Sequence, residues 1–142
     1  MFLKKVFKRS CNGSLMAEAA LVIPMLVGIS FVIIEFGNVL YLTNSLNQIS
    51  RSAARYASVT SSYTQQSLIT ASSASSLLPD VSKLTLSITP APGASRNIGA
   101  TITVTARYNY TPIINPFGLL NSNTSWAPKI KSTSAARSEV SS

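Results

Sequence analysis

The chain has 142 residues, of which 46% are hydrophobic and only 11% are charged, whereas an ordinary soluble domain carries about 25% charged residues. This shortage of charge indicates that part of the chain is not surrounded by water. Histidine is absent and cysteine occurs once, which excludes a Ser-His-Asp relay, a His-ligated metal and an internal disulfide. Because the chain also holds only four carboxylates, we expect a protein that is not an enzyme and that uses no cofactor and no metal.

The positive charge is concentrated near the N-terminus. The formal net charge is +8, and four basic residues stand within the first nine positions: Lys4, Lys5, Lys8 and Arg9. The other basic residues are scattered singly, unlike the dense basic stripe of a nucleic-acid-binding protein. We therefore do not expect nucleic acid as a partner, and we interpret the basic N-terminus as a signal of membrane topology.

A long apolar segment follows the basic residues. Residues 19–34 carry no charge, and the apolar character resumes after Glu35 as far as Leu42. A helix over 19–42 would be about 36 Å long, against about 30 Å for the hydrocarbon core of a bilayer. The pattern predicts a single membrane-spanning helix over 14–42, with the N-terminus in the cytoplasm and the C-terminal part outside. The alternative is a cleaved secretory signal, whose apolar core is usually only about 7–15 residues long.

The helical periodicity continues beyond the apolar segment. Residues 43–60 contain neither Pro nor Gly, and their apolar residues recur at steps of three and four. This pattern predicts an amphipathic extension of the same helix to about Val59. Residues 61–142 are expected to form a small extracytoplasmic domain, which begins with a short helix over 66–80.

An alternation with a period of two predicts strands in the rest of the domain. Apolar and polar residues alternate over 83–90 and over 98–110, with a turn-rich loop between them, as is typical of an antiparallel hairpin. A third, weakly patterned strand is predicted over 129–140. A sheet laid across the projecting half of the long helix would bury both apolar faces. The expected fold class is therefore α+β, with a long N-terminal helix, a short helix and about three antiparallel strands.

A glycine and a carboxylate stand where the basic leader meets the apolar helix. Gly13 is followed by Ser14 and, five residues after the glycine, by Glu18. A carboxylate at the edge of an apolar helix is costly and needs a partner. Cleavage after Gly13 would create an amine on Ser14, about one helical turn from Glu18. In the alternative interpretation, Glu18 is an interfacial residue that reaches the lipid headgroups, and the leader is retained.

These features together resemble the type IV prepilins. Gly13 followed by Glu18 and an apolar helix is similar to the prepilin processing site, and residues 18–24, 34–41 and 52–57 resemble the TadE-like pseudopilins of the tight-adherence (Flp) pilus system. The resemblance implies a pilin-like fold, removal of the leader by a prepilin peptidase, and a minor pilin-like subunit that assembles or primes a Tad/Flp-type pilus for adhesion and colonisation. The implied partners are the peptidase, other pilins and pseudopilins, the pilus assembly platform and membrane lipid. The implied location is the bacterial cytoplasmic membrane or the pilus itself.

Four further residues of the apolar helix are candidate assembly positions. Pro24 should bend or loosen the helix, and Gly37, beside Phe36, offers a close-packing position for another helix. Glu35 lies about 24 Å from Glu18 along the helix. It is either a solvated flank at the outer interface or a buried partner for a Lys or Arg of another subunit.

The outer domain allows two interpretations of its aromatic residues, and the whole chain allows two further functions. Tyr108, Tyr110 and Trp126 either pack in the core of the sheet domain or form an adhesive surface patch. The chain as a whole is alternatively an anchored adhesin or DNA-uptake pseudopilin whose outer domain binds a surface or nucleic acid by itself. The other alternative is an uncleaved membrane-anchored domain without a pilus role.

Overall fold

The structure is a computed structural model that describes residues 12–113 and 127–141, with the backbone alone for residues 12–14. The predictions that concern the basic leader before residue 12 and the packing of Trp126 lie outside the described residues.

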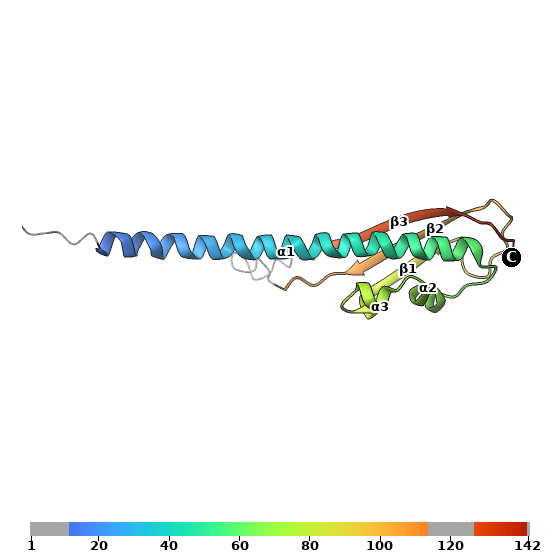
Figure 1. The fold of residues 1–142 in the computed structure, drawn as a ribbon, viewed down its shortest axis with the longest axis horizontal. Coiled ribbons are helices and arrows are strands. Elements are labelled where there is room, and N and C mark those ends of the chain that lie inside the picture. Colours follow the sequence, from blue (N-terminus) through green and yellow to red (C-terminus); the bar gives the residue numbers. More distant parts are fainter. Residues whose placement is uncertain (1–11, 114–126, 142) are drawn as a thin grey trace, which may run out of the picture.

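One long helix extends through most of the molecule. α1 (Asn12–Val59) has 48 residues, so it is about 72 Å long, and its first half projects beyond a small domain (Figure 1). The predicted end at Val59 is confirmed. The helix is continuous through Pro24, and α1 is drawn without a sharp kink in Figure 1.

Short helices and a sheet form the domain. Among the described residues, the helices are α2 (Gln65–Ala71), α3 (Ala74–Leu77) and the 3-10 helix η1 (Val81–Lys83). The strands are β1 (Leu84–Thr89), β2 (Thr101–Asn109) and β3 (Lys129–Arg137). They form an antiparallel sheet in the order β1-β2-β3. The predicted α+β fold, with its antiparallel hairpin and third strand, is therefore confirmed.

The short helix predicted over 66–80 is divided in two. α2 begins with a capping box, in which Ser67 N–H donates to Thr64 Oγ1 at 3.2 Å and Thr64 N–H donates to Ser67 Oγ at 2.9 Å. Ser73, between α2 and α3, has a φ of +53°. This left-handed conformation ends a right-handed helix, so the prediction of one continuous helix was wrong.

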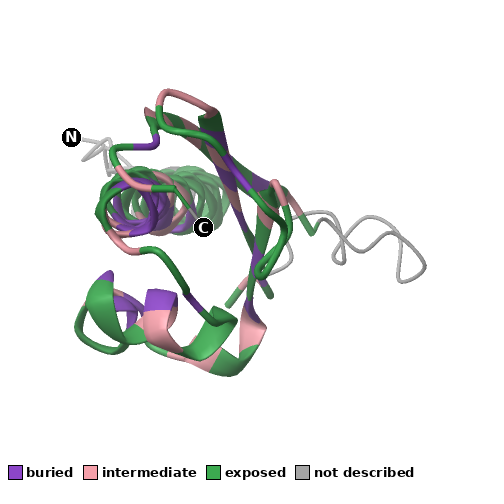
Figure 2. Cartoon of the chain, turned by 90° about the vertical axis from the view of Figure 1, so that its right-hand side faces the viewer, coloured by how far each residue is buried: buried purple, intermediate pink, exposed green. Residues whose placement is uncertain are grey.

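The second half of α1 lies between the sheet and the short helices. In the end-on view of Figure 2, the sheet covers one side of α1 and the short helices cover another. Three small residues of α1, Ala53, Ala54 and Ala57, are buried, and their short side chains let the neighbouring elements approach the helix closely. The largest fully buried apolar side chains are Leu46, Ile49, Leu68, Ile102 and Val104.

A polar seam joins α1 to β3 within this packing. Ser50 Oγ lies 2.9 Å from Ser132 Oγ and 2.8 Å from Ser134 Oγ. The hydroxyl of Ser132 donates to Asn47 Oδ1 at 2.6 Å. Because Ser50 is fully buried, an unpaired hydroxyl at this position would be costly. The seam therefore sets the height of β3 along α1.

The end of β2 turns two tyrosines towards α1. Tyr108 and Tyr110 are both buried, so they pack in the core, as the first of the two interpretations predicted, and do not form a surface patch. Burial raises the pKa of the Tyr108 hydroxyl above its usual value.

Candidate functional site

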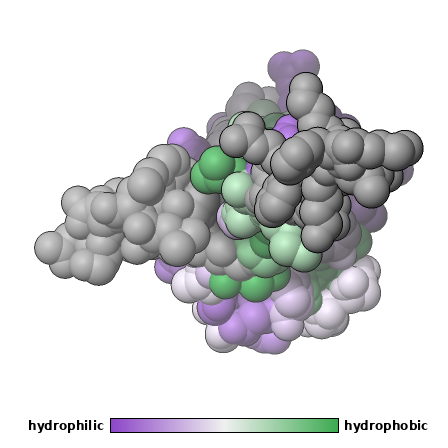
Figure 3. Space-filling view, turned by 90° about the vertical axis from the view of Figure 1, so that its left-hand side faces the viewer, coloured by the Kyte–Doolittle hydropathy of each residue, from purple (hydrophilic) through white to green (hydrophobic). Residues whose placement is uncertain are grey.

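The first half of α1 is an exposed apolar surface. Every residue from Leu15 to Ile34 is exposed, and large apolar side chains such as Leu21 and Ile33 are among them. Seen along α1 from its N-terminal side, apolar residues lie near the centre and hydrophilic residues lie at the edges of the domain (Figure 3). Within the described part of the chain, α1 alone is long and apolar enough to cross a membrane. The segment is therefore consistent with a single membrane span.

Glu35 lies at the boundary between the exposed half and the packed half of α1. It is only 3% exposed. Its Oε1 accepts a hydrogen bond from the Tyr110 hydroxyl at 2.5 Å and another from the Ile113 N–H at 3.3 Å. The interpretation of Glu35 as a solvated flank was wrong, because the segment after β2 returns to α1 and supplies these donors. A Lys or Arg partner from another subunit concerns a contact between chains and stays a prediction.

The second carboxylate oxygen of Glu35 is also buried. Oε2 has no hydrogen-bond partner among the described residues. A buried oxygen without a partner loses its hydration and gains nothing in return. Such groups are rare in folded proteins, which makes Oε2 a candidate contact for a further donor.

The Tyr110 hydroxyl that holds Glu35 is difficult to ionise. Burial, followed by the hydrogen bond to Glu35, raises the pKa of Tyr110 to about 12. An ordinary tyrosine has a pKa of about 10. Tyr110 therefore stays neutral and keeps its donor proton throughout the physiological pH range.

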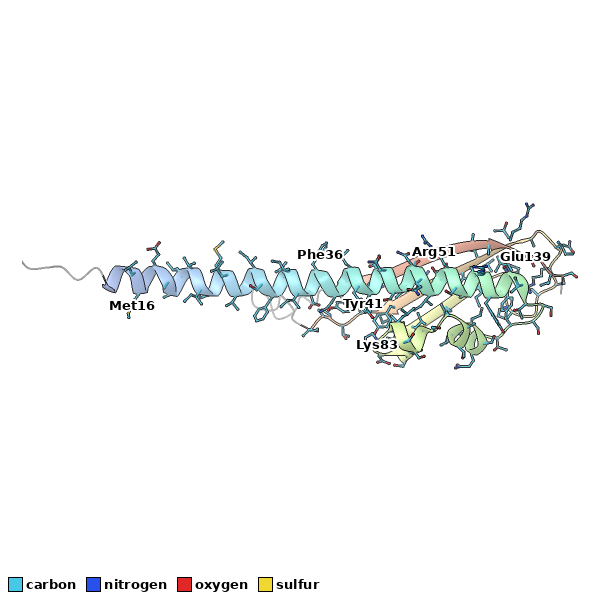
Figure 4. All side chains as sticks on the ribbon, viewed as in Figure 1. Met16, Phe36, Tyr41, Arg51, Lys83 and Glu139 are labelled. Atoms are coloured by element: carbon cyan, nitrogen blue, oxygen red, sulfur yellow. The ribbon has the colours of Figure 1, made fainter. Side chains whose placement is uncertain are left out.

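A cavity of about 570 Å³ opens beside this contact, between α1 and the end of the sheet. Asn38, Tyr41 and Lys83 are among its lining residues, and Tyr41 lies on the side of α1 that faces α3 and Lys83 (Figure 4). The Lys83 ammonium donates to Thr111 Oγ1 at 3.0 Å. Within the described residues, no group of three His, Cys, Asp or Glu side chains that could hold a metal ion is present. Lys83 of the cavity lining is thus already engaged by a hydrogen bond.

The predicted processing residues lie in the first turns of α1. Gly13 and Ser14 follow its first residue, and Glu18 is exposed. Glu18 makes no hydrogen bond or ion pair with another residue that the structure describes. Glu18 and Glu35 thus stand at opposite ends of the exposed apolar segment, and among the described residues Glu35 has hydrogen-bond partners whereas Glu18 has none.

The other predicted assembly residues are also exposed. Pro24, Phe36 and Gly37 are exposed, and a Cβ atom added at Gly37 would meet nothing within 4 Å. Phe36 projects from the side of α1 opposite to Tyr41 (Figure 4). The structure does not bring these residues together with Glu35 in one cluster, but it leaves their surfaces open to a neighbouring helix.

Sequence reasoning missed Arg96, which holds the C-terminal end of α1. The guanidinium donates to the carbonyl oxygens of Ala57 at 2.8 Å, Ser61 at 3.1 Å and Thr60. It also lies 4.9 Å from the centroid of the Tyr63 ring. The last carbonyls of a helix lack partners within the helix and carry partial negative charge, so a cation is favourable there. A lone Arg in a turn-rich loop was the available signal, but its partners are distant in sequence.

The fold and the site define a class of protein in which a long, exposed apolar helix enters a small α+β domain. Residues 13–55 match the family model described as TadE-like protein. The match confirms the predicted resemblance over α1 and is consistent with a TadE-like protein of the Tad pilus system. No curated protein and no solved structure matches the chain.

Proposed function

We propose that the protein is a minor pilin-like subunit that helps to assemble or prime a Tad/Flp-type pilus, with a structural and not a catalytic role. The match of residues 13–55 to the TadE-like family carries this proposal. The exposed apolar half of α1 supports it, because such a surface needs either lipid or other apolar helices around it. A subunit that passes from the membrane into a helical assembly would use the same surface in both places.

The proposal includes removal of residues 1–13 by a prepilin peptidase. Gly13 stands at the start of α1, after the basic residues that favour a cytoplasmic N-terminus. Exposed Glu18 has no partner among the described residues. It is therefore free to pair with a new amine on Ser14, in the same chain or in a neighbouring one.

The proposed partners follow from this pathway. They are the prepilin peptidase, other pilins or pseudopilins, and the pilus assembly platform in the bacterial cytoplasmic membrane. Adhesion and colonisation would then depend on this protein through the pilus, and not through a ligand bound by its own domain.

Intact-mass measurement tests the processing step. The protein would be purified from native membranes of strains with and without the prepilin peptidase, and we expect a mature form that begins at Ser14 only where the peptidase is present. Gly13→Leu should retain the leader. Gly28→Leu is the matched control, because a Cβ atom at Gly28 meets nothing within 4 Å and the same side chain is added away from the cleavage site. A wild-type chain that keeps residues 1–13 in both strains would contradict processing.

Counting pili by electron microscopy tests the pilus role. Deletion of the gene should remove most pili, and Glu18→Gln should be processed but should restore few of them, since the neutral amide cannot neutralise the new amine. Glu139→Gln is the control, because Glu139 is an exposed carboxylate at the end of the domain far from Met16 (Figure 4). Normal pilus numbers in the deletion strain would contradict the proposal and favour an anchored domain without a pilus role.

A further inference from the structure

Three basic side chains gather on the outer face of the sheet at one end. Arg107 of β2 stands directly opposite Lys131 of β3, and Lys129 stands opposite Asn109. The side chains of Arg107, Lys129 and Lys131 are all exposed. None of these three side chains makes a hydrogen bond or an ion pair with another described residue. We call these three residues the basic end of the sheet.

The basic end of the sheet surrounds a hollow of about 390 Å³. The described residues that line it are Arg107, Tyr108, Asn109, Lys129, Ile130 and Lys131, and none of them is acidic. Like charges directly opposite each other on neighbouring strands are destabilising. The repulsion between these positive charges therefore destabilises the sheet here, and no carboxylate in the lining offsets it. An anionic ligand would remove this repulsion.

The charged pair Asp80 and Lys83, which precedes β1, does not neutralise this hollow. Asp80 precedes η1, Lys83 is the last residue of η1, and the two carry opposite charges, so together they add no net charge. The Asp80 carboxylate accepts hydrogen bonds from the Ser82 amide at 3.0 Å and from the Ser82 hydroxyl at 2.6 Å, and these bonds lower the pKa of Asp80.

The basic end of the sheet lies next to the end of the apolar segment of α1. Tyr110 directly follows Asn109 and hydrogen-bonds Glu35, where the exposed apolar segment ends. Arg107 is three residues before Tyr110, so it lies about 10 Å further along the strand direction. Lys129, which faces Asn109, is closer still to the level of Glu35.

These heights match the layers of a bilayer. The helix rises about 30 Å from Leu15 to Glu35, which equals the thickness of the hydrocarbon core. The headgroup layer adds about 5–8 Å on each side, and Lys and Arg side chains extend towards it. With α1 inserted, the basic end of the sheet is therefore held at the depth of the phosphate groups.

We propose that the basic end of the sheet binds the phosphates of anionic phospholipid headgroups in the leaflet next to the domain. This inference rests on the membrane insertion of α1 within the proposed function, but not on the pilus role. The length of α1 selects lipid as the occupant, because the anchor keeps headgroups within reach permanently, at a high effective concentration. Lipid contact would fix how the domain lies on the membrane surface.

The full-length chain in lipid nanodiscs allows a direct test. Electron paramagnetic resonance would measure the association of spin-labelled phosphatidylglycerol relative to spin-labelled phosphatidylcholine. Each Lys or Arg near an anionic surface strengthens association by about five-fold. Lys129→Gln/Lys131→Gln should therefore lower the preference for phosphatidylglycerol by about 25-fold, and 0.5 M salt should also lower the wild-type preference.

The double variant Arg51→Gln/Arg55→Gln is the matched control. It removes the same charge from two exposed side chains. Arg51 of α1 lies further from the N-terminal end of the molecule than Lys83 of η1 does (Figure 4). Both residues are about 24–30 Å beyond Glu35 along the helix, which is more than two Debye lengths at physiological salt. The lipid preference of this variant should equal that of the wild type.

Three results would overturn the inference. An unchanged preference in the Lys129→Gln/Lys131→Gln variant would leave the hollow to an acidic segment of a neighbouring subunit, and an equal fall in both double variants would show a general effect of charge. A chain that does not enter nanodiscs would contradict the membrane span itself. This last result is distinguishable from the others, because the chain is then missing from the nanodisc fraction. All four substitutions are at exposed positions, and circular dichroism would verify that each variant is folded.

Discussion

The two halves of α1 have the same backbone conformation but opposite surroundings. From Leu15 to Ile34 every side chain is exposed, whereas Leu46, Ile49 and Ala53 of the second half are completely buried. The first half is apolar on all sides, as a helix in lipid must be, and the second half is apolar only where it faces the domain. The first half is therefore suited to lipid or to other apolar helices and the second half to the domain, and Glu35 marks the change from one to the other.

The largest expected effect comes from removing a large side chain from the packed half. Leu46→Ala should destabilise the domain by about 2–5 kcal/mol, because it leaves a cavity at a fully buried position. Ile33→Ala, in the exposed half, should change the stability of the domain by less than about 0.5 kcal/mol. Urea unfolding of both variants in nanodiscs, followed by near-ultraviolet circular dichroism, measures the difference. Equal losses of unfolding free energy in the two variants would show that both halves of α1 contribute to the stability of the domain.

A smaller effect is expected at the end of the packed half. Arg96→Gln should cost about 2 kcal/mol, because charged hydrogen bonds to carbonyls at the end of α1 and just after it are lost. Arg51→Gln removes an exposed arginine from the same helix and should be nearly neutral. Hydrogen exchange should show faster opening of residues 55–61 in the first variant alone. Unchanged exchange in Arg96→Gln would contradict a role in holding the helix end.

The contact at the boundary between the halves should have a more modest effect. Tyr110→Phe removes a donor to the buried carboxylate of Glu35 and should destabilise the domain by about 1–3 kcal/mol. Tyr41→Phe is the matched control, since the Tyr41 hydroxyl bonds the Leu77 carbonyl at 3.1 Å in an exposed setting. In the same urea experiment, the free energy of unfolding should fall less in Tyr41→Phe than in Tyr110→Phe. The reverse order would indicate that the Glu35 contact contributes little.

The smallest effect should appear only at high pH. The pKa of Tyr110 is raised to about 12 in the folded chain, against about 10 for a tyrosine in an unfolded chain. Its contribution to stability is complete below pH 10 and is lost as the pH rises to about 12, because the unfolded chain releases the proton first. Between pH 9 and pH 11 the free energy of unfolding should fall less in Tyr110→Phe than in the wild type. Part of the fall should remain, because the pKa of Tyr108 is also raised.

Periodicity made most of the fold predictable. A step of three and four residues predicted the helix as far as Val59, and a step of two predicted the hairpin whose observed strands are β1 and β2. These signals are local, because the apolar or polar character of each residue indicates whether its side chain faces the core or the solvent. The break at Ser73 was not predictable in this way, because no local sequence pattern distinguishes a serine that adopts the left-handed conformation.

The candidate site was less predictable because its contacts join distant parts of the chain. Gly13 and Glu18 were found because they are close together in sequence. Glu35 was found as a residue, but its partner Tyr110 is 75 positions away. Pairing them requires the height of the sheet along α1, and hydroxyl contacts such as that between Ser50 and Ser132 fix that height without leaving a sequence pattern.

The polar seam between α1 and β3 also has a mechanical consequence. β3 lies along α1 (Figure 1), and Ser50 bonds both Ser132 and Ser134. A pulling force along the helix axis would therefore load these bonds and the neighbouring strand ladder in shear, so that many bonds must break together. A force across the axis would open them one after another. The domain is thus built to resist tension along the direction in which its anchor would be pulled.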